Sequence, residues 1–311
     1  MSNASDLVIR EATERDTPAL SAFMQAQKQP RSSVEYLRHW YFHAPVKGGT
    51  VIVGERDGAV IGMATMTAHR FQQGHSTALV AMPQKVLTDS ALRGQGIFGK
   101  LYRASESACL EKGADFFLTV TNAASTDIFL NKFGYVRLPS PRMAVMLPLF
   151  GKVETRSPIA ADVVTSTASK ESDVWRMMKD SAHHQWRFID HPLREYVMAS
   201  CSMKGEELGV VFLKRIKKKG VPVMLLLDMV PRYEARLPQL LRAARKLTWK
   251  HRAFALLCLH EETFAQAIKD NSPIAQRSSG FNFLVKGKDD AHTRELASQR
   301  FEISFGDLDF F

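Results

Sequence analysis

The pattern of apolar and polar positions predicts that the chain opens with a strand and two helices. Residues 7–10 alternate like a short strand, and residues 17–27 repeat apolar side chains at the spacing of an amphipathic helix. Ser32 and Glu35 have the spacing of a capping box, which predicts that a second helix begins there and ends before Pro45.

An antiparallel meander follows, and then helices and strands alternate. Residues 51–56 and 60–69 are predicted strands joined by Asp57-Gly58, a pair that tolerates the positive φ of a tight hairpin. A third strand covers 78–88. The rest of this half is predicted to be a glycine-rich stretch at 93–99, a helix to about 112, a strand at 116–120, a short helix at 125–132 and a last strand after 135.

The second half repeats this order of elements. Gly58 and Gly62 recur 147 residues later as Gly205 and Gly209. With one inserted residue, Trp40, Phe42 and Pro45 recur as Trp186, Phe188 and Pro192. A duplication explains such matches more simply than chance does. We therefore expect an α/β fold with α+β mixed sheets in two tandem domains, residues 1–150 and 151–311, each an antiparallel meander followed by βαβαβ.

The glycine-rich stretch is the feature that the second copy lacks. Residues 231–235, Pro-Arg-Tyr-Glu-Ala, stand where 93–99 stood, between a strand at 221–230 and a helix at 235–249. We therefore expect the second copy to be degenerate and to serve an acceptor site or a structural role. Residues 151–173, rich in Ser, Thr and Ala, are expected to hold the boundary and the second copy's first strand.

Charge alone leaves several classes of partner open. The sequence has 42 Lys and Arg against 32 Asp and Glu, a net charge of +10 that would suit nucleic acid, a membrane surface or a polyphosphorylated small molecule. The densest basic run, 214–219, precedes Gly220 and is typical of a solvated hairpin turn. It contains no aromatic residue, so nucleic acid is the less favoured partner.

The remaining composition indicates an ordinary globular protein. The longest apolar stretch, 221–230, is interrupted by Asp228 and is too short to span a membrane, and no secretory signal is recognisable, so we expect a cytoplasmic protein. Cys109, Cys201 and Cys258 lie far apart in apolar segments and are expected to be buried thiols. No metal site is expected.

The chemistry that the sequence predicts most directly belongs to the glycine-rich stretch. A glycine turn between a strand and a helix lets backbone N–H groups converge on an anion at the positive end of the helix dipole, and pyrophosphate is a natural occupant. Residues 94–99 also satisfy GxGxxG. A dinucleotide fold is disfavoured, because the strand at 116–120 leads into Thr121-Asn122 rather than into an acidic residue. A structural glycine turn is the alternative.

The same segment resembles the acyl-CoA signature Q/R-x-x-G-x-G/A of the GNAT superfamily of N-acyltransferases, although Phe98 stands at the last position and Gly99 follows one place late. The helix led by Asn122 and the Gly134-Tyr135 ending are similar to the family's pattern. The resemblance implies binding of acetyl-CoA or another acyl-CoA, with coenzyme A contacts at Val86, Leu87, Thr88, Arg93, Gly94, Gln95, Gly96, Ile97, Phe98, Gly99, Asn122, Ser125 and Phe129.

Catalysis by direct attack of a neutral amine needs a base, an oxyanion donor and an acid for the thiolate. The tyrosine that the family often uses as acid falls near Phe129 or Leu130, and neither can donate a proton. Asp89 is a candidate base beside the expected thioester, with a solvated loop acid as the alternative interpretation.

The resulting hypothesis is an N-acyltransferase, in the first instance an acetyltransferase, that acts on the amine of a small molecule. Residues that we expect near the acceptor are Trp186, Arg187, Asp307 and Asp309. The alternative hypothesis is a non-catalytic acyl-CoA-binding or sensing module.

Overall fold

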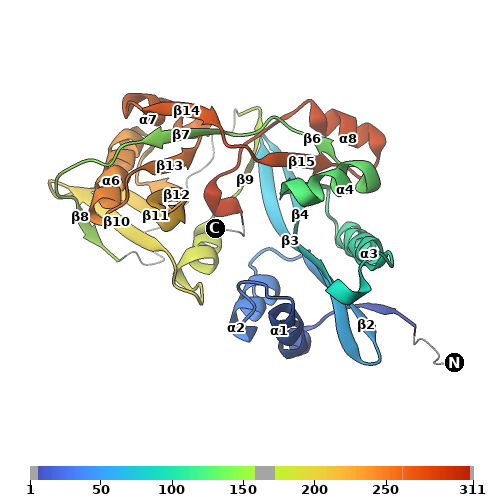
Figure 1. The fold of residues 1–311 in the computed structure, drawn as a ribbon. Helices are drawn as coiled ribbons and strands as arrows, with labels where there is room; N and C mark the ends of the chain where they lie inside the picture. The colour runs from blue at the N-terminus through green and yellow to red at the C-terminus, as the bar shows by residue number, and fades with distance from the viewer. Residues whose placement is uncertain (1–5, 158–171, 261, 309–311) are drawn as a thin grey trace.

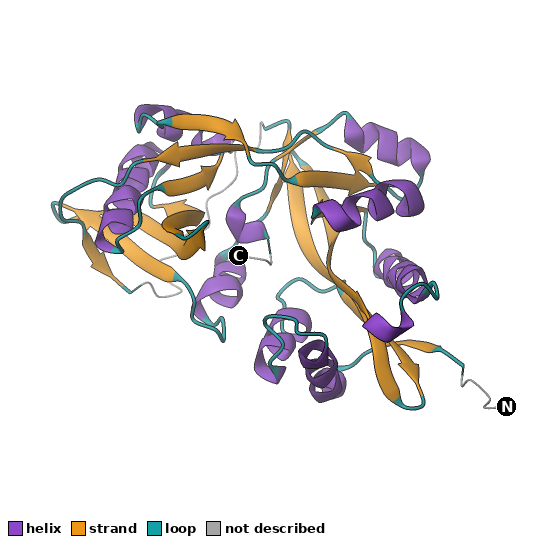
Figure 2. Cartoon of the chain, viewed as in Figure 1, coloured by secondary structure: helices purple, strands orange, loops and turns teal. Residues whose placement is uncertain are grey.

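The computed structural model describes residues 6–157, 172–260 and 262–308 (Figure 1). Within them the strands form two mixed sheets that lie side by side, each flanked by helices (Figure 2). The predicted fold class is confirmed, and the parallel pairing of β4 with β5, and of β12 with β13, follows each meander as expected.

The first sheet has the order β1-β2-β3-β4-β5-β15-β6. Its strands are β1 (Val8–Glu11), β2 (Thr50–Arg56), β3 (Ala59–Gln73), β4 (Ser76–Thr88), β5 (Phe116–Thr121), β15 (Asn282–Lys286) and β6 (Val136–Arg137). Strand β9 (Val174–Met177) pairs with the end of β3 and with β16 (Arg300–Phe301).

The second sheet has the order β8-β10-β11-β12-β13-β7-β14. Its strands are β8 (Glu154–Arg156), β10 (Val197–Met203), β11 (Glu206–Lys218), β12 (Val221–Pro231), β13 (Leu256–Leu259), β7 (Arg142–Met146) and β14 (Ala275–Ser278). Strand β8 lies inside 151–173, where the sequence predicted the second copy's first strand.

The two copies exchange one strand. Strand β7 follows β6 in the sequence but lies between β13 and β14 in the second sheet, while β15, from the end of the chain, lies between β5 and β6 in the first (Figure 1). Both exchanged strands are antiparallel to both neighbours. The predicted division at residue 150 therefore does not coincide with the division between the sheets.

The helices lie where the hydrophobic pattern places them, with small shifts at their ends. They are α1 (Thr17–Ala26), α2 (Val34–Leu37), α3 (Ile97–Glu111), α4 (Ala123–Phe133), α5 (Ser181–His184), α6 (Leu237–Lys250), α7 (Glu262–Asp270) and α8 (Asp290–Ala297). The cap of α2 is Ser33, whose hydroxyl accepts from the Tyr36 amide, rather than the predicted Ser32. The predicted hairpin turn is present, with φ of 54° at Asp57 and 73° at Gly58.

The duplication keeps one offset through the first part of each copy. Helices α2 and α5, strands β2 and β10, and strands β3 and β11 each begin 147 residues apart. The structural counterpart of Trp186 is therefore His39, and no inserted residue is needed. The sequence match of Trp40 with Trp186 was one position out of register.

A shared core joins the two halves. Phe71 and Phe116 of the first sheet belong to the same buried cluster as Phe212 and Leu225 of the second. Helices α1 and α2 cover the other end of this face of the first sheet, helix α3 covers the opposite face, and α6 and α7 cover the outer face of the second sheet. The halves are thus joined by apolar packing as well as by exchanged strands.

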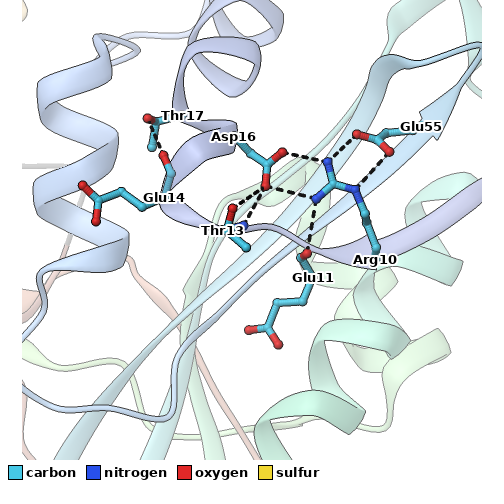
Figure 3. Close-up of polar contacts among 7 residues, drawn as sticks. All are labelled: Arg10, Glu11, Thr13, Glu14, Asp16, Thr17 and Glu55. Atoms are coloured by element: carbon cyan, nitrogen blue, oxygen red, sulfur yellow. Dashed lines mark hydrogen bonds and ion pairs between the residues drawn. The ribbon is translucent and has the colours of Figure 1, made fainter.

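A charged network fixes the N-terminal edge of the first sheet (Figure 3). Arg10 on β1 donates to both carboxylate oxygens of Glu55 on β2, at 3.0 and 2.6 Å, and to both of Asp16, at 3.0 and 2.7 Å. The Asp16 carboxylate also accepts from the Thr13 amide, at 2.7 Å. These bonds to Arg10 hold the pKa of Asp16 well below its usual range.

Candidate active site

The predicted anion-binding loop adopts the backbone geometry that such a site needs. Gly94 and Gly96 have φ of 84° and 75°, which side chains with a Cβ rarely adopt, and α3 begins directly afterwards at Ile97. A Cβ at either glycine would meet nothing within 4 Å, so the space above the loop is open. The first amides of a helix lack intrahelical partners, and those of α3 are available to an anion.

A cavity of about 270 Å³ opens beside this loop. Its walls include Arg93, Gly94 and Gly96 from the loop, Ile97 and Phe98 from α3, and Val86, Leu87 and Thr88 from β4. It is a short channel between the helix start and the end of strand β4.

A second cavity of about 690 Å³ lies where β4 and β5 separate. The two strands pair only at Val80 with Phe116 and at Ala81 with Phe117. Gln29, Val86, Leu87 and Phe98 line both this cavity and the one beside the loop, so the two cavities adjoin. Together they extend from the glycine loop to the gap between the strands.

The structure gathers most of the predicted cofactor residues around this space. Those in the walls are Val86, Leu87, Thr88, Arg93, Gly94, Gly96, Ile97, Phe98, Asn122, Ser125 and Phe129. Gln95 and Gly99 belong to the loop and the first turn of α3 but not to the walls. Asn122 caps α4 by accepting from the Ser125 amide at 3.0 Å, so part of its role is to begin that helix.

Comparison with known proteins gives a family for the segment that contains the glycine loop. Residues 8–137 match the family described as an acetyltransferase (GNAT) domain. This segment is a GNAT acetyltransferase domain. A comparison with curated protein sequences gives no match.

Solved structures match the chain beyond that domain. A GCN5-related N-acetyltransferase from Anabaena variabilis aligns over 91% of this chain and 73% of its own, with a TM-score of 0.60 and 10% identity. One from Kribbella flavida aligns over 94% and 74%, with a TM-score of 0.59 and 13% identity. Eis1 from Mycobacterium abscessus aligns over 91% and 74%, with a TM-score of 0.56 and 14% identity. At these identities the likeness shows a shared fold over both halves.

Phe129 cannot supply the general acid that is expected of the GNAT domain for the leaving thiolate. Phe129 lines the cavity, whereas Leu130 packs among the apolar residues behind it. The nearby phenols of Tyr102 and Tyr135 are fully buried and hydrogen-bonded to each other at 2.7 Å. Burial raises the pKa of both well above the usual range, and neither belongs to the cavity walls.

The carboxylate of Asp89 has a structural task. It accepts from the Ala91 amide at 2.9 Å and caps the short helical turn before the glycine loop. Asp89 is absent from the walls of both cavities. Asp89 is therefore not proposed as the base.

A bulge in β4 places polar groups that the sequence analysis did not single out in the wall of the cavity between β4 and β5. Opposite Thr65, the strand accommodates the extra residue of the pair Gln84 and Lys85. The Gln84 amide donates to Thr67 Oγ1 at 3.0 Å, and its buried Oε1 has no hydrogen-bond partner among the described residues. Such an oxygen can accept from an N–H group. The sequence does not reveal the bulge, because the apolar residues on both sides of Gln84 and Lys85 predict one uninterrupted strand.

The residues predicted near the acceptor have different roles. Arg187 is buried, and its guanidinium donates to the carbonyls of Gly306 and Leu308 at 2.8 and 3.0 Å, so it anchors the C-terminal segment. Trp186 packs between the halves. Asp307 lines the cavity between β4 and β5. Asp309 lies outside the described residues.

Two negative findings apply to the part of the chain that the structure describes. None of its helices is both long and apolar enough to cross a membrane. Nowhere in it do three or more His, Cys, Asp or Glu side chains gather in a way that could hold a metal ion.

Proposed function

We propose that this chain transfers an acetyl or other acyl group from acyl-CoA to the amine of an acceptor. The observation that carries the proposal is the pair of adjoining cavities that extends from the glycine loop to the gap between β4 and β5, an arrangement that suits an elongated ligand with an anionic end. GNAT domains generally bind acyl-CoA, which supports this assignment of the space.

Different groups of the chain would bind different parts of acyl-CoA. The amides at the start of α3, with Arg93 beside them, would hold the pyrophosphate. Strand β4 has no β5 partner beyond Ala81, so its backbone polar groups on that side can bond to the amides of pantetheine. Phe98 and Phe129 supply apolar walls.

Acyl-CoA supplies the thioester whose carbonyl the amine attacks. A carbon–nitrogen bond forms, the carbon–sulfur bond breaks, and the proton that the amine loses ends on the thiol. Gln84 Oε1, which has no hydrogen-bond partner within the described part of the chain, can orient the amine by accepting one of its N–H groups. The amide oxygen of Gln84 cannot take up the proton, so water would relay it from the amine to the leaving thiolate.

The test is transfer of a labelled acetyl group from acetyl-CoA to members of a panel of amines, followed by mass spectrometry of the product. We expect one amine class to be acetylated faster than the rest. Coenzyme A binding with no transfer to any amine would leave the non-catalytic module as the better account.

That second candidate, an acyl-CoA-binding module, is favoured by one observation. Phe129 stands in the cavity where the family's acid is expected, and the neighbouring Tyr102 and Tyr135 hydroxyls are committed to each other. Slow and unselective transfer across the panel would support it.

A further inference from the structure

The second copy has its own cavity in the place that corresponds to the coenzyme A cleft. Strands β12 and β13 pair only at Met224 with Leu256 and at Leu225 with Leu257, and then separate as β4 and β5 do. Strand β12 is also bulged where it faces Phe212, the counterpart of Thr65. A cavity of about 1120 Å³ lies beside the end of this strand.

This second cavity lacks the glycine position that is proposed to leave room for pyrophosphate in the first. Gly94 lies three residues before Ile97, where α3 begins, and Glu234 lies three residues before Leu237, where α6 begins. Glu234 is part of the cavity wall. In the second copy the carboxylate of Glu234 therefore occupies the position that corresponds to Gly94, where the first copy leaves room for an anion.

The net charge of the cavity walls also differs in sign between the second-copy cavity and the coenzyme A cavities. Seven Asp and Glu but only four Lys and Arg line the second-copy cavity, in a chain whose net charge is +10. By contrast, the charged residues in the walls of the coenzyme A cavities are Lys85, Arg93 and Asp307. A wall of this sign attracts cations.

Two of the carboxylates are deeply buried and held in place. Asp228, at the position that corresponds to Lys85, accepts from Lys179 Nζ at 3.3 Å and lies 3.1 Å from His184 Nε2. Although burial opposes ionisation, Lys179 and His184 hold the pKa of Asp228 below its usual range. Lys179 also pairs with Asp307 at 2.8 Å.

A third buried carboxylate is only partly satisfied. Glu302 is 8% exposed, its Oε2 has no hydrogen-bond partner among the described residues, and its ion pair with Arg176 Nε is long, at 3.8 Å. Glu302 lines the same cavity. A buried carboxylate oxygen without a hydrogen bond is costly, and a donor on a ligand would relieve that cost.

The two clefts meet at one residue. Asp307 lines the second-copy cavity and also the cavity between β4 and β5. Its short helical turn lies between the two sheets in the middle of the molecule (Figure 1). The second-copy cavity therefore adjoins, at Asp307, the cleft in which the proposed thioester would lie.

We propose that the second-copy cavity is the acceptor site and that the acceptor is an aliphatic amine with a second positive charge. The attacking nitrogen has to be neutral, whereas carboxylates favour protonated nitrogen. The acidic wall therefore recognises a second cationic group of the acceptor, while the reacting amine passes Asp307 into the first cleft. This inference rests on the proposed acyl transfer.

The first experiment compares acceptors that differ only in the second charge. With saturating acetyl-CoA, kcat/KM is measured for cadaverine, for pentylamine and for the carboxylate-bearing aminovalerate. We expect cadaverine to exceed pentylamine by about tenfold or more, with aminovalerate lowest, and we expect the difference to shrink as salt is raised. Equal values for cadaverine and pentylamine would overturn the proposal.

The second experiment uses a matched pair of variants. Glu234→Gln removes an exposed carboxylate of the cavity wall, and Glu111→Gln removes an exposed one at the end of α3, outside the cavity. We expect Glu234→Gln to raise KM for cadaverine by roughly threefold to tenfold, with KM for pentylamine and affinity for coenzyme A unchanged. Equal effects of the two variants would contradict the proposal.

The possible failures are distinguishable. If no amine is acetylated although coenzyme A binds, the proposed function fails and this inference fails with it. If amines are acetylated but neither the second charge nor Glu234 matters, acyl transfer stands and the assignment of the second-copy cavity is wrong. Calorimetric titration of cadaverine into the coenzyme A complex, with Glu234→Gln as comparison, tests the site without turnover.

Discussion

Trp40 and Trp186 stack on each other between the two copies, with ring centroids 4.8 Å apart and an angle of 27° between the rings. Each belongs to the π-helical turn of its own copy. Trp186 Nε1 donates to the carbonyl of His39 at 3.0 Å, and a ring nitrogen of His39 bonds to the Trp186 carbonyl at 2.8 Å. The two duplicated turns therefore pack against each other and form part of the interface between the copies.

We expect Trp186→Ala to destabilise the whole protein, because Trp186 is 5% exposed and its loss leaves a cavity between the halves. Truncation of a buried tryptophan typically costs about 3–5 kcal/mol. Trp186→Phe, which keeps a ring but loses the Nε1 donor, should cost about 1–2 kcal/mol. Denaturant unfolding measures both, and a negligible effect of Trp186→Ala would show that this contact does not support the interface.

Gly96→Asp should weaken coenzyme A binding by about tenfold or more, because a carboxylate would fill and repel the pyrophosphate position. Gly113→Asp is a matched control: Gly113 also has positive φ, and a Cβ there would also meet nothing within 4 Å. Both substitutions strain the backbone, but only one lies in the cavity wall. If calorimetry gave the two variants similar affinities for coenzyme A, the loop would not be part of the binding site.

One coenzyme A should bind per chain. Glu234 occupies the position in the second copy that corresponds to Gly94, so an anion meets a carboxylate there instead of open space. Calorimetric titration should give a single site whose affinity Glu234→Gln leaves unchanged. Two equivalent sites would contradict this assignment of the copies.

Acid should destabilise the protein through histidines buried near the interface. Burial, with the nearby charges of Arg187 and Lys179, lowers the pKa of His69 from 6.5 to about 3, and burial also holds the pKa of His183 well below its usual value. At a pH between the lowered pKa of each folded histidine and its ordinary pKa in the unfolded state, the unfolded state binds a proton that the folded state does not. The free energy of unfolding should therefore fall as pH falls through this window, by up to about 1.4 kcal/mol per pH unit for each histidine.

The control for this pH dependence is a histidine outside the core. His69→Gln should reduce the slope of the free energy of unfolding against pH by up to the contribution of one proton. His75→Gln, at an exposed hairpin turn, should leave that slope unchanged. Denaturant midpoints measured from pH 7 to pH 4 give the slopes. Parallel slopes for wild type and His69→Gln would show that His69 titrates normally in the folded state.

Cleavage of the chain after Gly151, at an inserted protease site, should not separate the halves. The N-terminal piece keeps β7 in the second sheet, and the C-terminal piece keeps β15 in the first. We expect both pieces to elute together in native gel filtration and to separate only in denaturant. A stable, coenzyme A-binding piece that elutes alone would contradict this expectation.

Local features of the fold could be predicted because their signals lie close together in the sequence. The Asp57-Gly58 hairpin and the loop around Gly94 and Gly96 each need a positive φ, which narrows the choice of residues, and the structure has that φ at each of them. The amphipathic spacing likewise placed α1 and α6 within a few residues.

The partners of β7 and β15 could not be predicted in this way. A short apolar run such as 283–285 is compatible with a buried strand but carries no information about which sheet edge it joins. The second-copy cavity was missed for a related reason. Asp228 and Asp307 belong to segments far apart in the sequence, and the C-terminal turn that brings them to the same lysine gives no periodic signal.

The strand exchange also constrains the order in which the protein can fold during synthesis. When residues 1–137 have left the ribosome, the β5 edge of the first sheet still lacks β15, which is synthesised about 150 residues later. At ~5–20 residues per second this edge stays unpaired for roughly seven to thirty seconds. The nascent first copy is therefore incomplete until almost the whole chain has emerged, and its open edge is the place where a chaperone, or a neighbouring nascent chain, would bind first.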